Sequence, residues 1–115
     1  MFRSVEYAGF EGRSDLRERA VKATTVLAEE LADVAGDCAV GWKYEDRQPS
    51  GIGLELDLQL PAASGRGERL IPLPAFGDEG ELRSQFRRTA LVALNDYFAK
   101  RRPVWAELSR ATVGV

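Results

Sequence analysis

The sequence contains no histidine and only one cysteine, Cys38. Without histidine, imidazole acid–base catalysis, a Ser-His-Asp triad and histidine metal ligation are all excluded. A single cysteine cannot form an internal disulfide, which favours a reducing compartment, and its place among alternating apolar residues predicts a core position rather than a nucleophile. We therefore expect a cytoplasmic protein that is not an enzyme and that uses no cofactor and no metal.

Long apolar runs and complete phosphate-loop motifs are also missing. No stretch approaches the roughly twenty apolar residues that span a bilayer, and the N-terminus lacks the apolar segment of a secretory signal. The glycine pairs Gly51/Gly53 and Gly65/Gly67 lack the continuation of a nucleotide-binding loop and are interpreted as turn glycines. The sequence thus predicts no membrane partner and no nucleotide-binding loop.

The chain also lacks a strong excess of one charge sign. Its formal net charge is −2, which argues against attraction of nucleic acid by the molecule as a whole. Residues 76–115 nevertheless carry seven basic and five acidic side chains, and they are the only third of the chain with a positive balance. A nucleic-acid site would therefore have to be a local patch.

What the sequence does contain is typical of one globular domain. Of its 115 residues, 44% are hydrophobic and 30% are charged, which is enough apolar material for a packed core. No internal repeat, low-complexity tract or long linker divides the chain. We expect one domain over residues 1–102, followed by a short C-terminal helix and tail over residues 103–115.

Two segments show the helical spacing of apolar residues. The first runs from residue 14 to 35, with Ser14 as the expected N-cap and Gly36 as the stop. Asp78 and Glu81 have capping-box spacing at the start of the second helix, and Pro103 is expected to end that helix and begin a tail helix. The apolar arc predicted to bury the second helix comprises Leu82, Phe86, Ala90, Ala93, Leu94 and Tyr97, extended by Leu91 and Phe98.

Four segments have strand character, namely residues 2–8, 38–45, 52–60 and 68–74. Alternation of apolar and polar residues is clearest in the second and third, and residues 46–51 and 62–67 are turn clusters. Pro72 has no amide to donate, so the last strand belongs at a sheet edge. The predicted fold is α+β, in the order β-α-β-β-β-α: an antiparallel sheet of three or four strands carries two long helices on one face and turns its other face to solvent or a partner.

Basic residues crowd the beginnings of both predicted helices, where they oppose the helix dipole. One interpretation is a solvated stripe of ion pairs, such as Asp15 with Arg19. The other is a basic edge able to meet phosphates, which would form if the two helices packed side by side and roughly parallel. The candidate residues of that edge are Arg13, Arg17, Arg83, Arg87 and Arg88.

Three segments outline a known layout. They are VEYAGFEGRSDLRERAVKATTVLAEEL (5–31), the hairpin strands WKYED and GLELDLQL, and the closing FRRTALVALNDYFAKRR. Their order resembles that of the ribosome hibernation-promoting factors, relatives of the double-stranded-RNA-binding fold. In that family basic helix residues face ribosomal RNA, so the resemblance implies a ribosome- or structured-RNA-binding regulator of translation. The corresponding positions here are Arg17, Lys22, Arg83, Arg87 and Arg88.

A second hypothesis is a small protein-binding adaptor, chaperone or inhibitor of the immunity type. Trp105 and Leu108 lie three residues apart beyond the main core, so they are candidates for a protein contact, as is the open sheet face. Only a pocket that gathered Glu55, Asp57 and arginine side chains would favour an enzyme. The first helix also carries a small apolar stripe, which a homodimer contact would explain, formed by Val21, Ala28 and Ala32.

Overall fold

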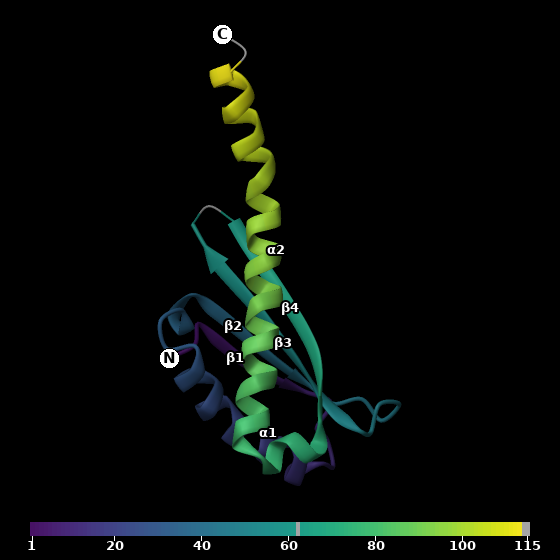
Figure 1. The fold of residues 1–115 in the computed structure, drawn as a ribbon. Helices are drawn as coiled ribbons and strands as arrows, with labels where there is room; N and C mark the ends of the chain where they lie inside the picture. The colour runs from purple at the N-terminus through teal and green to yellow at the C-terminus, as the bar shows by residue number, and fades with distance from the viewer. Residues whose placement is uncertain (62, 114–115) are drawn as a thin grey trace.

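The fold is described by a computed structural model that covers residues 1–61 and 63–113, and only the backbone of residues 101–113. Four strands and two long helices follow in the predicted order (Figure 1). Two short 3₁₀ helices, η1 and η2, connect them. In chain order the elements are β1 (Ser4–Ala8), α1 (Ser14–Glu30), η1 (Ala35–Asp37), β2 (Cys38–Lys43), β3 (Gly51–Leu60), β4 (Ala63–Pro72), η2 (Leu73–Gly77) and α2 (Glu79–Val113).

The sheet has the strand order β1-β2-β3-β4, and its strands are mixed in direction. β2, β3 and β4 are antiparallel neighbours, as predicted for the hairpins. β1 and β2 are instead parallel, because α1 crosses over the sheet and returns the chain in its original direction. The α+β prediction is confirmed, and a mixed sheet takes the place of the wholly antiparallel one.

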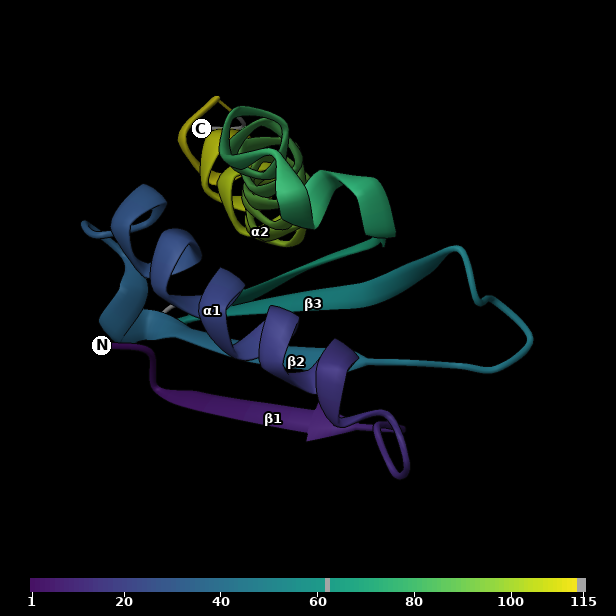
Figure 2. The same cartoon turned by 90° about the horizontal axis from the view of Figure 1, so that it is seen from below.

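Both helices cover the same face of the sheet (Figure 2). The period-two pattern of the strands makes one face of the sheet apolar, and the helices cover that face. Alternate side chains of β2 and β3 point under the helices and are almost fully buried, whereas their neighbours face outward. The helix-facing set includes Cys38, Val40, Trp42, Leu54, Leu56 and Leu58. No helix within the described residues is long and apolar enough to cross a membrane.

α1 is fixed to the sheet by a partly buried threonine as well as by apolar contacts. The indole Nε1 of Trp42 donates a hydrogen bond to Thr24 Oγ1 at 2.9 Å. Thr24 in turn donates to the carbonyl oxygen of Ala20, so the Tyr7 hydroxyl, 3.2 Å away, donates to Thr24. One threonine therefore satisfies groups from β1 and β2 at once, which gives α1 a defined position on the sheet.

β4 differs from its prediction. Residues 62–67 were expected to form a turn, but β4 begins at Ala63 and pairs with β3 as far as Pro72. Gly65 and Gly67 are buried strand residues that face α2; an added Cβ would lie 2.2 Å and 2.4 Å from carbonyl oxygens of that helix. The two glycines let the helix backbone lie directly on the strand. Pro72 ends β4 at the sheet edge, as predicted.

The edge of β4 is also held by a helix side chain. The backbone N–H of Arg66 donates to Asp96 Oδ2 on α2, at 2.8 Å. Lys100, one turn further along the helix, pairs with the same carboxylate at 2.9 Å. Together with the Lys100 contact, this hydrogen bond lowers the pKa of Asp96.

The helix ends lie partly elsewhere than predicted. Asp78 does cap α2, because its Oδ1 accepts the N–H of Glu81 at 3.2 Å. Ser14, however, is the first residue of α1 rather than its cap, and α1 ends at Glu30, since Gly36 belongs to η1. α2 continues through Pro103 to Val113 instead of ending there: proline removes one backbone hydrogen bond, but the helical path continues on both sides.

Candidate functional site

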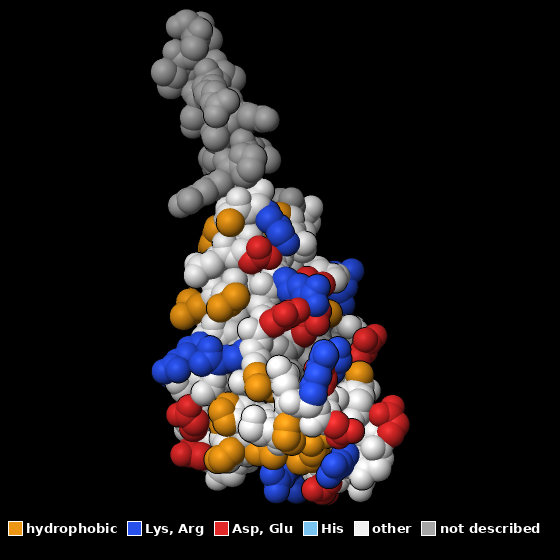
Figure 3. All heavy atoms as spheres, turned by 90° about the vertical axis from the view of Figure 1, so that its right-hand side faces the viewer, with side chains coloured by type: hydrophobic (Ala, Val, Ile, Leu, Met, Phe, Trp, Pro, Cys, Tyr) orange, Lys and Arg blue, Asp and Glu red, His pale blue; other side chains and the backbone are white. Residues whose placement is uncertain are grey.

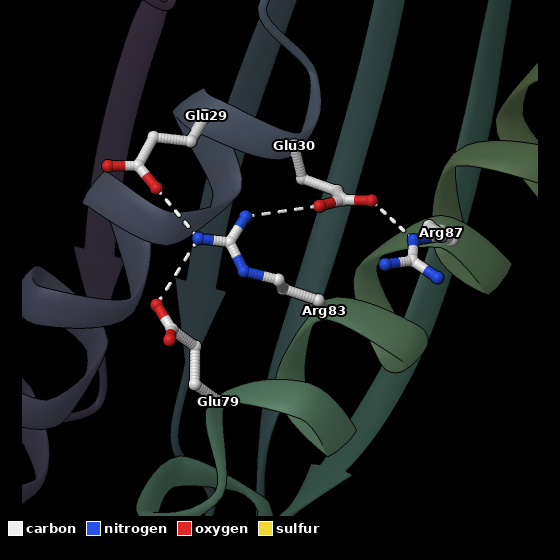
Figure 4. Close-up of polar contacts among 5 residues, drawn as sticks. All are labelled: Glu29, Glu30, Glu79, Arg83 and Arg87. Carbon is white, nitrogen blue, oxygen red and sulfur yellow. Dashed lines mark hydrogen bonds and ion pairs between the residues drawn. The ribbon is translucent and has the colours of Figure 1, made fainter.

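Arginines at the start of α2 bind glutamates at the end of α1 (Figure 4). Arg83 reaches Glu29 at 2.7 Å, Glu30 at 3.1 Å and Glu79 at 3.2 Å. Arg87 contacts the second carboxylate oxygen of Glu30. The hydrogen bonds from Arg87 and Arg83 lower the pKa of Glu30. We call these five residues the α1–α2 ion-pair network.

The network explains why both helices carry charges that oppose their own dipoles. Acidic residues at the C-terminal end of α1 and basic residues near the N-terminal end of α2 are each unfavourable within one helix. Because these two helix ends meet, the glutamates of α1 pair with the arginines of α2. The charges of Arg83 and Arg87 are thus used within the chain to join the helices.

The structure does not bring the predicted basic edge together. Arg13 and Arg17 lie at the start of α1, a 17-residue helix about 25 Å long, whereas Arg83 and Arg87 lie beside its end. Arg13 sits over the Tyr44 ring at 5.8 Å, and Arg17 over the Tyr7 ring at 4.9 Å. The parallel side-by-side packing that the edge required is replaced by an end-to-start contact.

Lys22 and Arg88 are the two other predicted nucleic-acid-binding residues. Both are exposed, and neither makes an ion pair in the part of the chain whose side chains are described. Lys22 is on α1, and Arg88 follows Arg87 on α2, so they belong to different surfaces. A small basic surface at the beginning of α1 is all that remains of the expected patch.

The ion-pair network predicts an acid-sensitive contact between the helices. Because the pKa of Glu30 is lowered in the folded state, its contribution is complete above the unfolded value of about 4.3 and is lost as pH falls through the lower folded value. We expect Glu30→Gln to lose less stability than the wild type between pH 7 and about pH 3. Urea denaturation at both pH values measures this. Glu18→Gln, an exposed carboxylate on the same helix, is the matched control, and equal acid sensitivity in all three proteins would contradict the prediction.

The outer side of α2 exposes three large apolar side chains. Leu91 is 58% exposed, Val92 47% and Phe98 57%. Leu91 and Phe98 were predicted to extend the buried arc, and that prediction is wrong. α2 lies so close to Gly65 and Gly67 that Thr89 and Ala93 fill the contact, which leaves Leu91 and Phe98 on the far side. We call Leu91, Val92 and Phe98 the outer α2 face.

The predicted contact residues Trp105 and Leu108 have side chains outside the described residues. In the sequence they follow Phe98 by seven and ten positions. Leu91, Leu94 and Phe98 have the same three-and-four spacing, which is typical of a seam between helices. A seven-residue repeat therefore groups Leu91 with Phe98 in the sequence, and Val92 lies outside that repeat.

The uncovered face of the sheet is polar and hollowed. A groove of about 540 Å³ there is lined in part by Glu55, Arg66 and Glu68. Arg66 pairs with both glutamates, at 2.9 Å and 2.7 Å. Asp57 does not line the groove and accepts a hydrogen bond from Gln59 instead. Of the two carboxylates considered for an enzyme, Glu55 therefore lines the groove and Asp57 does not.

Neither a reactive thiol nor a metal-binding cluster is found among the described residues. Cys38 is buried, and burial raises the pKa of its thiol to about 11, as expected for a core cysteine. No group of three or more acidic or cysteine side chains in this part of the chain is arranged to hold a metal ion. Comparison of the chain with protein-family models, curated proteins and solved structures found no significant match.

Proposed function

We propose that the chain is a non-enzymatic protein-binding module whose outer α2 face contacts a protein partner. The observation that carries the proposal is the exposure of Leu91, Val92 and Phe98, each about half or more accessible, along two turns of one helix. Large exposed apolar side chains that include an aromatic are typical of interaction surfaces. The single buried thiol, Cys38, fits a partner in the reducing cytoplasm.

The shape of the molecule supports contact along a helix. Figure 1 shows α2 extending beyond the end of the sheet, and the longest dimension of the molecule is 63 Å against 29 Å and 23 Å. In Figure 3 hydrophobic side chains occur among charged side chains of both signs along the length of the molecule. A partner helix aligned with α2 would cover apolar residues at seven-residue intervals.

The test is partner capture with variants of the outer α2 face. We expect the double variant Leu91→Gln/Phe98→Gln to lose a partner that the wild type captures from its native cell, with the circular dichroism spectrum unchanged. Val21→Gln is the matched control, because Val21 is 40% exposed on α1, away from this face. Sedimentation of the purified chain shows whether the partner is a second copy. An unchanged partner list for the double variant would refute the proposal.

A second candidate function is binding of structured RNA or the ribosome through the beginning of α1. It is favoured by the element order, which is the order expected from the resemblance to ribosome hibernation-promoting factors. Arg13 and Arg17 are exposed there, Arg13 lying 3.8 Å from Asp46, and Lys22 is exposed in the middle of the same helix. Capture at about 0.1 M and about 0.5 M salt separates the candidates: phosphate contacts weaken steeply with salt, and apolar contacts do not.

A further inference from the structure

The uncovered sheet face carries a groove that neither the fold nor the proposed contact of α2 uses. It is the 540 Å³ hollow, which crosses the sheet from β1 to β4. Gly41 of β2 and Gly53 of β3 line it from the two central strands. The loop after β2 closes one side through Glu45. We call this hollow the open-face groove.

Gly41 has no structural reason to be glycine. Its backbone φ is not positive, and an added Cβ would meet only the Cβ of Glu55, at an ordinary 3.7 Å. This contrasts with Gly65 and Gly67, where a Cβ would overlap the backbone of α2. Glycine inside a strand is destabilising relative to residues that bear a side chain. Because Gly41 has no side chain, nothing projects from this position of β2 into the groove.

The charges of the groove are unbalanced toward negative. Glu55 and Glu68 share the single cation Arg66, and Glu6 makes no ion pair with any described residue. Lys43 is already paired with Glu45 at 3.0 Å. Arg69 also borders the groove, but its guanidinium hydrogen-bonds Gln85 on the helix side of the sheet. The groove lining as a whole carries four acidic and three basic side chains, and the excess negative charge lies along Glu6, Glu55 and Glu68, which have only Arg66 among them. The complement of this acidic row is a ligand with spaced positive charges.

We propose that the open-face groove binds an extended, lysine- or arginine-bearing segment of a protein partner. Four strands about 4.8 Å apart make a track of roughly 14 Å, which an extended segment of four to six residues spans. Alternate side chains of such a segment point to the same side. Basic residues at every second position of the segment can therefore all face the carboxylates. Glu6 lies at one end of the track and Glu68 near the other.

The probe is a fluorescein-labelled six-residue peptide of alternating lysine and serine, with its glutamate–serine counterpart as the charge control. We expect fluorescence anisotropy to show binding of the lysine peptide at low ionic strength and about tenfold weaker binding to Gly41→Val, which fills the groove. The double variant Glu6→Gln/Glu68→Gln should weaken binding to a similar degree without changing the shape. Glu11→Gln, in the exposed turn after β1, is the matched control and should bind as the wild type does.

Thermal denaturation separates loss of binding from loss of fold, because we expect the melting temperature of Gly41→Val to equal or exceed that of the wild type. Should the valine variant unfold, Gly41→Ala and the double glutamine variant carry the test. Full binding to Gly41→Val, equal binding of the glutamate peptide, no binding of the lysine peptide, or equally tight binding of spermidine would overturn the proposal. Capture through the outer α2 face is expected to be unaffected by Gly41→Val, so the two proposals fail separately.

Discussion

Replacement of Trp42 with alanine is expected to lower the free energy of unfolding by about 3–5 kcal/mol. Trp42 is 1% exposed and packs against Phe76 and Phe86, with ring centroids 6.0 Å and 6.1 Å away. It joins β2 to η2, to α2 and, through its indole N–H, to α1. Since domains of this size are typically stable by only about 5–15 kcal/mol, the loss should be visible as a large shift in urea denaturation.

Two further variants separate the packing and the hydrogen bond of Trp42. Trp42→Phe keeps most of the apolar volume and should cost less than Trp42→Ala. Thr24→Val removes the acceptor of the indole N–H and should cost about 1–3 kcal/mol, because a buried donor is left without a partner. Thr25→Val, one residue along α1 and exposed, should stay within about 0.5 kcal/mol of the wild type. Equal effects of the two threonine variants would contradict the role assigned to Thr24.

Gly67→Ala is expected to destabilise the chain by about 1–3 kcal/mol or more. The new methyl group would lie 2.4 Å from the carbonyl oxygen of Thr89 and 3.0 Å from the backbone nitrogen of Ala93. Backbone atoms cannot rotate away as a side chain can, so α2 has to move off β4. Denaturation measures the cost, and hydrogen exchange of the α2 amides should show where it falls.

Gly41→Ala is the matched control for Gly67→Ala, because both glycines lie in strands of the same sheet. At position 41 the added methyl group has room, so stability should be unchanged or raised. A loss of stability at position 41 as large as that at position 67 would show that the effect comes from strand glycines in general and not from the contact with α2.

β2, β3, the core residues that they present to the helices and the Asp78 cap could be predicted because each depends on local spacing. The alternation in β2 and β3 determines which side chains lie under the helices, whatever the rest of the chain does. The contact between Glu30 and Arg83 could not be predicted, since nothing local tells which helix ends meet. The parallel-helix assumption that generated the basic edge failed at that point.

The seven-residue spacing groups Leu91 with Phe98, but it does not tell which side of α2 is buried. On a helical wheel Leu91 adjoins the apolar arc, and the arc would have been that wide against a sheet of large side chains. Because Gly65 and Gly67 present only backbone to α2, the contact is narrow and Thr89 and Ala93 fill it. The width of a buried helix face therefore depends on the size of residues in a distant strand, which the helix sequence does not contain.

The Asp96 contact at β4 has a consequence for self-association. An unpaired outer strand can recruit the same strand of another molecule and begin open-ended sheet growth. Here the amide of Arg66, in the middle of β4, is already taken by a carboxylate of the chain's own helix. A neighbouring molecule would have to displace that negatively charged group before it could extend the sheet. The β4 edge therefore resists fibril formation, while the outer α2 face stays accessible.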